Sequence, residues 1–386
     1  MKSLTSIYWD TTGTVKDDNV TLPGATFFQG FSGNDIITSN GQNNVILPGS
    51  GNNTVNINSN NDQILINRHP LNHDTINISE SGHHLTVVLD GSIRLRDLGF
   101  AFDGNNLVLK VGNGGNLSTA TQTIVINNAK NNLLLQFGTG FTLDLTKFNL
   151  TEVHQGDNED NTQTATGAAI LSGSFGNNTL NGGATGPSIF IGGAGNDMIN
   201  GSQDNSGDLY ILEDRGGFER ITGLDGTSIV SNKTVLIVST NAEFLGSAVL
   251  KRDEIWFATK ETVNKLPENF DREKLPNELN ELEDGELLIW IRGQNNGAII
   301  KDWDKWDETN RVVVTNQYEG AFEIKKEGIN TLLEIMDKYQ DLENKIYKPW
   351  HPDLNDEDAT LNLNEELSNA ILESSWQPTS SIISVA

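Results

Sequence analysis

The chain of 386 residues contains no cysteine. A disulfide framework, a thiolate zinc site and a cysteine nucleophile are therefore excluded. Long apolar runs are missing too: the start, Met1 to Asp10, has one basic residue and no apolar stretch of signal-peptide length, and no run reaches membrane-span length. We expect no cleavable N-terminal secretory signal and no transmembrane segment, so the chain either is cytoplasmic or leaves the cell by another route.

Basic residues are scarce. The sequence has 26 Lys and Arg against 52 Asp and Glu, a formal net charge of −26 and a pI near 4.4. A surface of this sign repels a phosphate backbone, so nucleic acid is not an expected partner. Divalent cations would relieve the self-repulsion of so many carboxylates.

Catalytic signatures are also missing. The sequence has no G-x-S-x-G, H-E-x-x-H or Walker-type loop. The spacing His69-x-x-x-His73 would make a zinc pair only on a helix, and Pro70 and the surrounding strand pattern argue against a helix there. We expect no catalytic residues and no enzyme activity.

A repeat of nine residues is present. Gly30 to Thr38 (GFSGNDIIT) fits the nonapeptide G-G-x-G-x-D-x-U-x at every marked position except the second. The next units keep an aliphatic residue at position eight and an Asp or Asn at position six; these are Ile37, Ile46, Val55 and Ile64, and Asp35, Asn44, Asn53 and Asp62. The period predicts short strands and tight turns that alternate between two parallel sheets, with position eight pointing between them.

The turns of this roll offer hard oxygen ligands. Turns on one side are two units apart, which predicts that Asp35 stacks over Asn53 and Asn44 over Asp62. Gly30, Gly33, Gly49 and Gly51 supply the turn conformations. Carboxylate and carbonyl oxygens between neighbouring turns suit calcium.

This stretch resembles the calcium-binding β-roll of the RTX (repeats-in-toxin, haemolysin-type) family of bacterial proteins exported by type I secretion. The resemblance implies calcium as the bound ion, the type I secretion apparatus as a partner, a secreted extracellular location and a toxin-related role. Each stacked pair here has one carboxylate, whereas RTX rolls usually bring more aspartate. We therefore expect dissociation constants on the order of 10⁻⁴ to 10⁻³ M.

The second half repeats the plan. Gly192 to Asn200 (GGAGNDMIN) matches every marked position, Gly173 to Leu180 is a further unit, and Asp208 to Ile211 closes the second roll. The predicted metal residues here are Gly173, Gly176, Asn178, Gly192, Gly195, Asp197 and Asp208. Their predicted stacked pairs are Asn178 with Asp197 and Ser188 with Asp208.

Each roll is followed by strand patterns in a common order. Asp97–Phe100, Leu107–Val111 and Thr123–Asn127 correspond to Glu254–Phe257, Glu286–Ile291 and Ala298–Trp303. This order predicts an internal duplication of roll plus antiparallel β module, and it resembles the module that follows rolls in RTX proteins. Trp290, Trp303 and Trp306 are interpreted as packing residues; the alternative is an aromatic platform for sugars.

The C-terminal region changes period. Apolar residues at spacings of three and four predict an amphipathic helix over 328–346, and 361–372 suggests a second helix with Asn364 as N-cap. The chain ends in hydroxylated and apolar residues. In the RTX family such an uncleaved tail is the export signal; the alternative is an ordinary helix docked on the last sheet.

The predicted fold is mainly β, with two parallel β-rolls, each followed by an antiparallel flanking module, and a short helical tail. The predicted segments are a lead-in (1–29), a first roll (30–75) and module (76–155), a second roll (166–212) and module (213–318, with an insertion at 261–284), and a C-terminal region (319–386). The expected function is a secreted calcium-binding RTX-type protein that folds on calcium binding outside the cell, either a toxin-related protein or the C-terminal calcium-binding and export portion of one. The alternatives are a calcium-stabilised adhesin or matrix protein that contacts a host surface, and a glycan-active enzyme.

Overall fold

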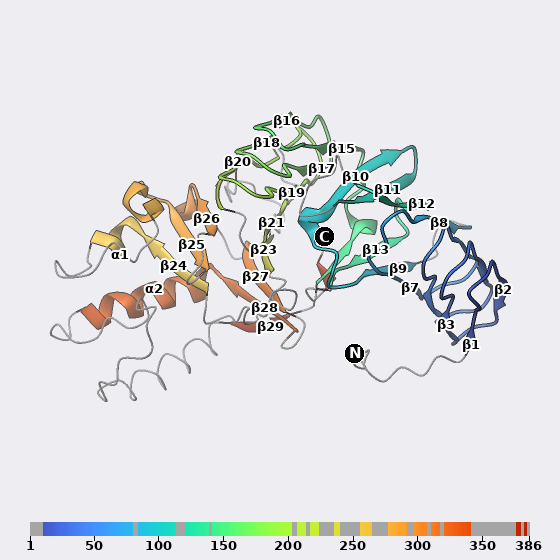
Figure 1. The fold of residues 1–386 in the computed structure, drawn as a ribbon. Helices are drawn as coiled ribbons and strands as arrows, with labels where there is room; N and C mark the ends of the chain where they lie inside the picture. The colour runs from blue at the N-terminus through green and yellow to red at the C-terminus, as the bar shows by residue number, and fades with distance from the viewer. Residues whose placement is uncertain are drawn as a thin grey trace.

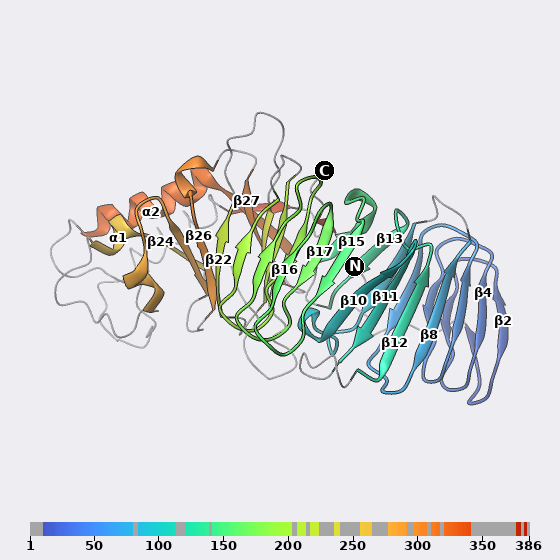
Figure 2. The same ribbon diagram turned by 90° about the horizontal axis from the view of Figure 1, so that it is seen from above.

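A computed structural model gives the fold of the chain. It describes residues 11–79, 84–112, 120–138, 141–202, 207–213, 217–223, 235–239, 255–264, 277–291, 296–306, 310–316, 320–340, 376–379 and 382–383. The described strands form four sheets, arranged as two facing pairs that follow one another along an elongated body (Figures 1 and 2). The protein is a parallel β-solenoid with antiparallel strands at the end of each roll, as the sequence predicts.

The first roll winds between two facing sheets. One sheet contains, in spatial order, β1 (Thr11–Thr12), β3 (Phe27–Gln29), β5 (Val45–Leu47), β7 (Asp62–Ile66), β9 (Leu85–Leu89), β13 (Leu133–Gln136), β14 (Thr142–Asp144) and β30 (Ile382–Ile383). The other contains β2 (Asn19–Leu22), β4 (Ile36–Ser39), β6 (Thr54–Ile57), β8 (His73–Ile78), β12 (Gln122–Asn127), β11 (Asn106–Val111) and β10 (Leu98–Asp103). Successive strands of the roll alternate between the two sheets, which is the winding that the nine-residue period predicts.

The position-eight aliphatics form the core between the sheets. Ile37, Ile46, Val55 and Ile64 are fully buried, and their strands pair in parallel two units apart, so that Ile37 lies beside Val55 and Ile46 beside Ile64. Along β6 and β7 every second residue is buried, and Val55, Ile57, Ile64 and Ile66 are the apolar residues at these inward positions. The predicted register of the first roll is confirmed by this pairing.

The second repeat has the same topology. Its first sheet contains β15 (Glu152–Gln155), β17 (Ala169–Ser172), β19 (Ile189–Ile191), β21 (Leu209–Glu213), β23 (Val235–Ser239), β27 (Arg311–Asn316), β28 (Gly320–Lys325) and β29 (Gln377–Thr379). Its second sheet contains β16 (Thr162–Thr164), β18 (Thr179–Asn181), β20 (Met198–Asn200), β22 (Phe218–Thr222), β26 (Gly297–Ile300), β25 (Leu287–Ile291) and β24 (Ile255–Thr259). The strand order matches that of the first repeat, which supports the duplication; the last strand differs in direction, since β30 is parallel to β14 whereas β29 is antiparallel to β28.

The flanking modules are only partly antiparallel. The order β10–β11–β12 is antiparallel, but β12 then joins β8 in parallel and β13 joins β9 in parallel. The equivalent strands β26 and β27 likewise join β22 and β23 in parallel. The alternating strand patterns after each roll therefore extend both of its sheets, because each new strand can pair with the open edge left by the last turn.

The second roll packs against the first module. In β17, β19 and β21 alternate side chains enter different cores: Ile170, Ile189 and Ile211 join the first core, whereas Leu171, Phe190 and Leu212 join the second. The hairpin strand β10 contacts β15 and β17 directly. A sheet that is covered on both faces reads as a continuous apolar run, which explains why these strands lack polar alternation.

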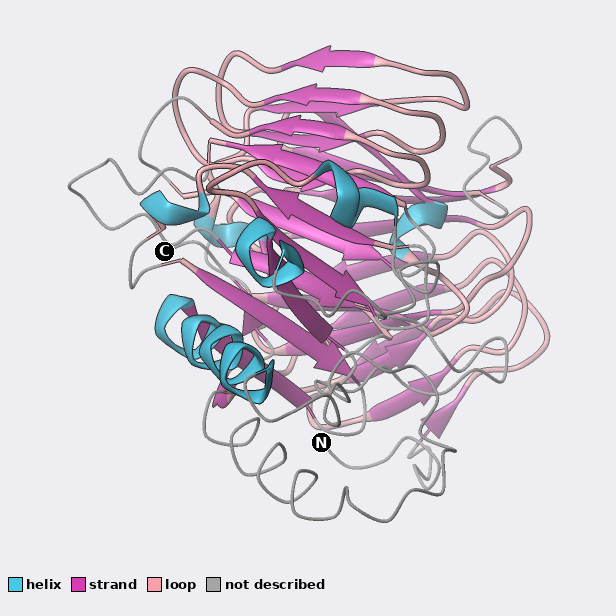
Figure 3. Ribbon diagram, turned by 90° about the vertical axis from the view of Figure 1, so that its left-hand side faces the viewer, coloured by secondary structure: helices cyan, strands magenta, loops and turns pink. Residues whose placement is uncertain are grey.

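Helices cover the second module. The helix α2 (Lys326–Gln340) packs against β24 and β28 (Figure 3), and this confirms the predicted helix as far as Gln340; the predicted helix at 361–372 lies outside the described residues. The insertion contains α1 (Lys260–Asn264) and a 3₁₀ turn (Asn277–Glu281), which bury Val263 and Leu279 against Trp290. No helix in the described ranges is long and apolar enough to cross a membrane.

Candidate metal-binding turns of the two rolls

Backbone conformation explains the turn glycines. Gly51 and Gly195 have φ of 118° and 135°, and a β-carbon there would lie 2.0 Å from the carbonyl oxygen of Gly33 or Gly176. Only glycine avoids this collision, because the stacked turns bring backbone against backbone. The remaining predicted turn glycines have either positive φ (Gly33, Gly49, Gly176) or no room for a β-carbon (Gly30, Gly173, Gly192).

The four predicted stacked pairs lie together. In each pair the backbone N–H of the first residue donates to the side-chain Oδ1 of the second, over N···O distances of 3.0 Å (Asp35 to Asn53), 2.8 Å (Asn44 to Asp62), 2.7 Å (Asn178 to Asp197) and 2.9 Å (Ser188 to Asp208). The second residue of each pair is buried. Position six therefore supplies an inward acceptor that ties its turn to the previous turn on the same side.

The Asp35 stack, defined as Asp18, Asp35, Asn53 and Asp74, is longer than the period predicts. The N–H of Asp18 donates to Asp35 Oδ1 at 2.9 Å over 17 residues, and the N–H of Asn53 donates to Asp74 Oδ1 at 3.1 Å over 21 residues. Sequence reasoning missed Asp18 and Asp74 because their spacings depart from the 18 residues of two repeat units. Asp18 lies 17 residues before Asp35, and Asp74 lies 21 residues after Asn53. The signal that could have found them is an aspartate at the start of a β strand: Asp18 directly precedes β2, and Asp74 is the second residue of β8.

The Asp197 stack, defined as Asn161, Asn178, Asp197 and Glu219, is its counterpart in the second roll. Asn161 N–H donates to Asn178 Oδ1 at 3.0 Å. Arg220 pairs with Met198, so the preceding residue Glu219 occupies position six after Asp197. A β-carbon on Gly192 would lie 2.6 Å from Asp197 Oδ2 and 3.1 Å from Glu219 Oε1, so these two buried carboxylates converge on one glycine.

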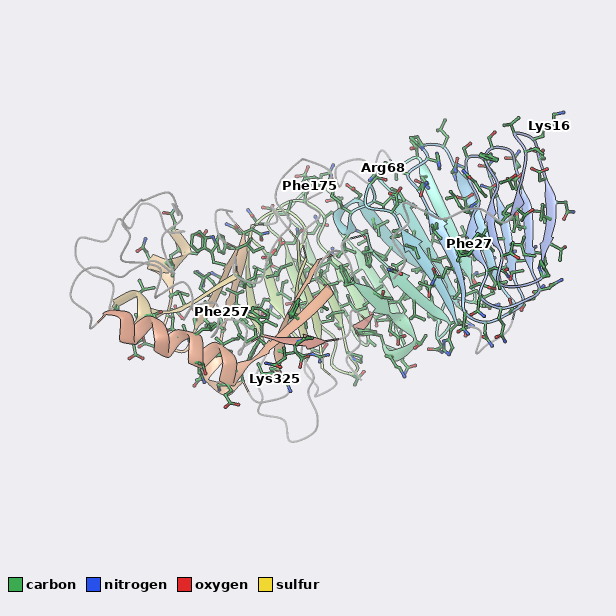
Figure 4. The ribbon with its side chains drawn as sticks, turned by 90° about the horizontal axis from the view of Figure 1, so that it is seen from below. Lys16, Phe27, Arg68, Phe175, Phe257 and Lys325 are labelled. Carbon is green, nitrogen blue, oxygen red and sulfur yellow. The ribbon has the colours of Figure 1, made fainter. Side chains whose placement is uncertain are left out.

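Figure 4 places Phe175 in the turns of the second roll and Lys16 near the free end of the first roll.

In each stack one aspartate, Asp35 or Asp197, has a carboxyl oxygen that no hydrogen-bond donor reaches. Among the described residues, Asp35 Oδ2 and Asp197 Oδ2 are enclosed by protein and accept no hydrogen bond. Asp35 is 1% exposed and Asp197 is 2% exposed. An unpaired buried carboxylate is costly, so each oxygen calls for a positive partner or a proton.

The electrostatic surroundings point the same way. Burial raises the pKa of Asp197 to about 6, and the charge of Asp160 adds to this, while the hydrogen bonds from Asn178 oppose it. Burial also raises the pKa of Asp35, with smaller contributions from the charges of Asp18 and Asp17. A bound cation would remove this penalty, because it stabilises the ionised form of each carboxylate.

The donor set fits a hard cation such as calcium. It consists of carboxylate oxygens beside a backbone rich in turn carbonyls, and it contains no sulfur. In the described part of the chain, no three His, Cys, Asp or Glu side chains gather in one place, so backbone oxygens and water would have to complete the coordination. Few charged ligands favour weak binding.

The other candidate residues are structural. Trp290, Trp303 and Trp306 are buried in the core of the second module, as predicted for packing residues. His73 begins β8 and His69 lies in the preceding loop, so the two histidines do not share a helix. The spacing of the two histidines is therefore not that of a zinc pair on one helix.

Comparisons with known proteins add little to this picture. No family model matches the chain, and no curated protein matches it. Among solved structures, an extracellular lipase LipA from Serratia marcescens is similar over 76% of this chain and 38% of its own length, with 15% sequence identity and a TM-score of 0.30. The chain thus spans well under half of that lipase, and the fold assignment rests on the strand pairing described above.

Proposed function

We propose that the chain is a secreted calcium-binding β-roll protein of the RTX type that folds when it meets calcium outside the cell. The observation that carries the proposal is the pair of buried carboxyl oxygens, Asp35 Oδ2 and Asp197 Oδ2, that lack a donor. Asp35 in the first roll and Asp197 in the second would each hold a separate ion together with turn carbonyls. The ion would supply the positive charge that these carboxylates lack.

Calorimetry on chelator-treated protein tests calcium binding. We expect dissociation constants of about 10⁻⁴ to 10⁻³ M, typical of extracellular calcium modules. The double variant Asp35→Asn/Asp197→Asn should lose this binding, because an amide keeps the Oδ1 acceptor but removes the charge. The control Asp103→Asn changes an exposed carboxylate in the β10–β11 turn and should bind as wild type does. Absence of calcium binding by wild type would refute the proposal.

Export by a type I apparatus through the C-terminal tail is the second part of the proposal. The tail is apolar and hydroxylated at its end, which is what the family resemblance implies for an uncleaved signal. The test is secretion from cells that carry a type I exporter, with the tail fused to an unrelated reporter. Export of the fusion would support the assignment, and retention of the fusion beside an exported control signal would contradict it.

A further inference from the structure

Four buried aspartates of the stacked pairs fall into two chemical kinds. Asp35 and Asp197 each keep one oxygen without a donor, whereas Asp62 and Asp208 are surrounded by donors. All four are almost fully buried, with exposures of 1%, 2%, 0% and 4%. Burial is therefore the same for both kinds. The difference between them must come from the neighbouring hydrogen-bond donors.

Two serines satisfy Asp62. Ser39 Oγ donates to Asp62 Oδ2 at 2.8 Å and Ser59 Oγ donates to the same oxygen at 2.7 Å, while Asn44 N–H donates to Oδ1 at 2.8 Å. Ser39 comes from the end of β4 and Ser59 from the turn that precedes β7, so adjacent windings supply the two hydroxyls. The carboxylate has donors on both oxygens.

Asp208 has an equivalent environment. Ser202 Oγ donates to Asp208 Oδ1 at 2.7 Å, and Ser202 N–H donates to Oδ2 at 2.8 Å. Tyr210 OH also donates to Oδ2, at 3.3 Å. In the second roll a different set of donors thus also satisfies both carboxyl oxygens of the aspartate.

The division follows the duplication. Asp35 and Asp197 lie in turns that lead into β4 and β20, strands of the two seven-stranded sheets. Asp62 and Asp208 begin or precede β7 and β21, strands of the two eight-stranded sheets. Each chemical kind occupies one side of its roll in both repeats.

We infer that each roll has one cation-binding side, at Asp35 and at Asp197 with Glu219, and one metal-independent side, where hydroxyl and backbone donors at Asp62 and Asp208 take the place of the ion. The cation-binding half rests on the proposed function; the metal-independent half does not. Calcium at Asp62 would have to displace two serine donors. Glu219 gives the second roll a two-carboxylate site, while the partner of Asp35 in the first roll is the neutral Asn53.

Paired aspartate variants test the division. Asp35→Asn and Asp197→Asn should each remove about one bound calcium per chain and raise the melting temperature in chelator, because a buried unpaired charge disappears. Asp62→Asn and Asp208→Asn should keep the full calcium stoichiometry and lower the melting temperature in chelator, because a satisfied carboxylate is lost. Loss of bound calcium in Asp62→Asn or Asp208→Asn would overturn the inference.

Milder variants guard against loss of folding. Ser59→Ala keeps Asp62 and removes one donor, so it should lower the melting temperature in chelator with calcium stoichiometry unchanged. If wild type binds no calcium, the proposed function fails, and the chelator measurements still decide the metal-independent half. If Asp35→Asn lowered the melting temperature in chelator as much as Asp62→Asn does, the division into two kinds of carboxylate would be overturned.

Glu219 has its own test. Glu219→Gln should weaken calcium binding in the second roll by about tenfold, since ligand charge sets affinity at such sites. Glu283→Gln, at an exposed glutamate of the same module, is the matched control and should bind calcium as wild type does. An unchanged titration of Glu219→Gln would remove Glu219 from the site.

Discussion

At the scale of single residues, the second position of the repeat shows where the sequence departs from its motif. Phe31 and Ser174 stand where the nonapeptide has glycine, and both have left-handed φ, at 68° and 69°. In the best-matched unit the same position is Gly193, with φ of 99°. A residue with a β-carbon costs roughly 1–2 kcal/mol in this region, so two turns are held under strain.

Phe31→Gly should therefore stabilise the protein. Relief of the strain, roughly 1–2 kcal/mol, outweighs the entropy of an added glycine, roughly 0.5–1 kcal/mol, and leaves a gain of up to about 1.5 kcal/mol. Urea unfolding should show a higher midpoint for Phe31→Gly and for Ser174→Gly. Ser32→Gly, at a neighbouring residue outside the left-handed region, should lower the midpoint; a gain there would contradict the explanation.

Asp197 should make stability depend on pH. Its folded pKa is about 6 against 3.8 for the ordinary carboxyl, so the folded state holds the proton more tightly. In chelator, stability should fall as pH rises from about 4 to about 6, by on the order of 3 kcal/mol for this group. Asp197→Asn should lose that part of the slope.

Calcium should reverse this dependence, because protons and calcium compete for the same carboxylate. The calcium-induced rise in melting temperature should be large at pH 7 and small at pH 5. Wild type and Asp197→Asn with identical pH profiles in chelator would show that Asp197 does not titrate in this window.

At the scale of elements, the C-terminal strands close both repeats. The strand β29 pairs with β28, and β30 pairs with β14, so the last strands of the chain sit at equivalent edges of the two eight-stranded sheets. Trp376, 1% exposed, packs against Phe257 with ring centroids 6.2 Å apart. Trp376, β29 and β30 are therefore part of the fold, whatever the role of the tail in export.

Trp376→Ala should destabilise the second module by about 3–5 kcal/mol, the range for removing a buried tryptophan. Denaturant unfolding would measure this, with Pro378→Ala as the exposed control in the same strand. A change below about 1 kcal/mol would mean that Trp376 is not in the core. Because Trp376 is buried, removal of the tail would disturb folding as well as export, so the reporter fusion is the sharper test of export.

At the scale of the whole molecule, two calcium sites are enough to couple binding to folding. With a dissociation constant near 0.1 mM, about 1 mM calcium stabilises the fold by about 1.4 kcal/mol per site, or about 3 kcal/mol for two. Sub-micromolar calcium contributes almost nothing. Three kcal/mol is a large part of the 5–15 kcal/mol that typically stabilises a domain.

We expect partial loss of β signal in circular dichroism when calcium is chelated, with recovery on addition of calcium. The loss should be partial because the Asp62 and Asp208 sides need no ion. Magnesium, which demands stricter geometry and keeps its water, should restore less signal. Equal stability in chelator and in calcium would show that folding of this protein is not coupled to calcium binding.

The sequence by itself determined the winding of the rolls and the stacked pairs. A period of nine places every second turn on the same side, so the pairing of Asp35 with Asn53 and of Asn178 with Asp197 followed from counting. The duplication was also visible, since both modules keep the same order of apolar strands. These features are local or periodic, and the backbone repeats them without reference to distant residues.

Only the tertiary structure decided which carboxylates have donors. Ser39 reaches Asp62 from 23 residues away, and Glu219 comes to Asp197 across an insertion that breaks the period. The burial of β17 and β19 on both faces and the closure of both repeats by the C-terminal strands have the same origin. Hydrogen-bond satisfaction and burial depend on atoms that the fold brings together, and sequence spacing does not encode them.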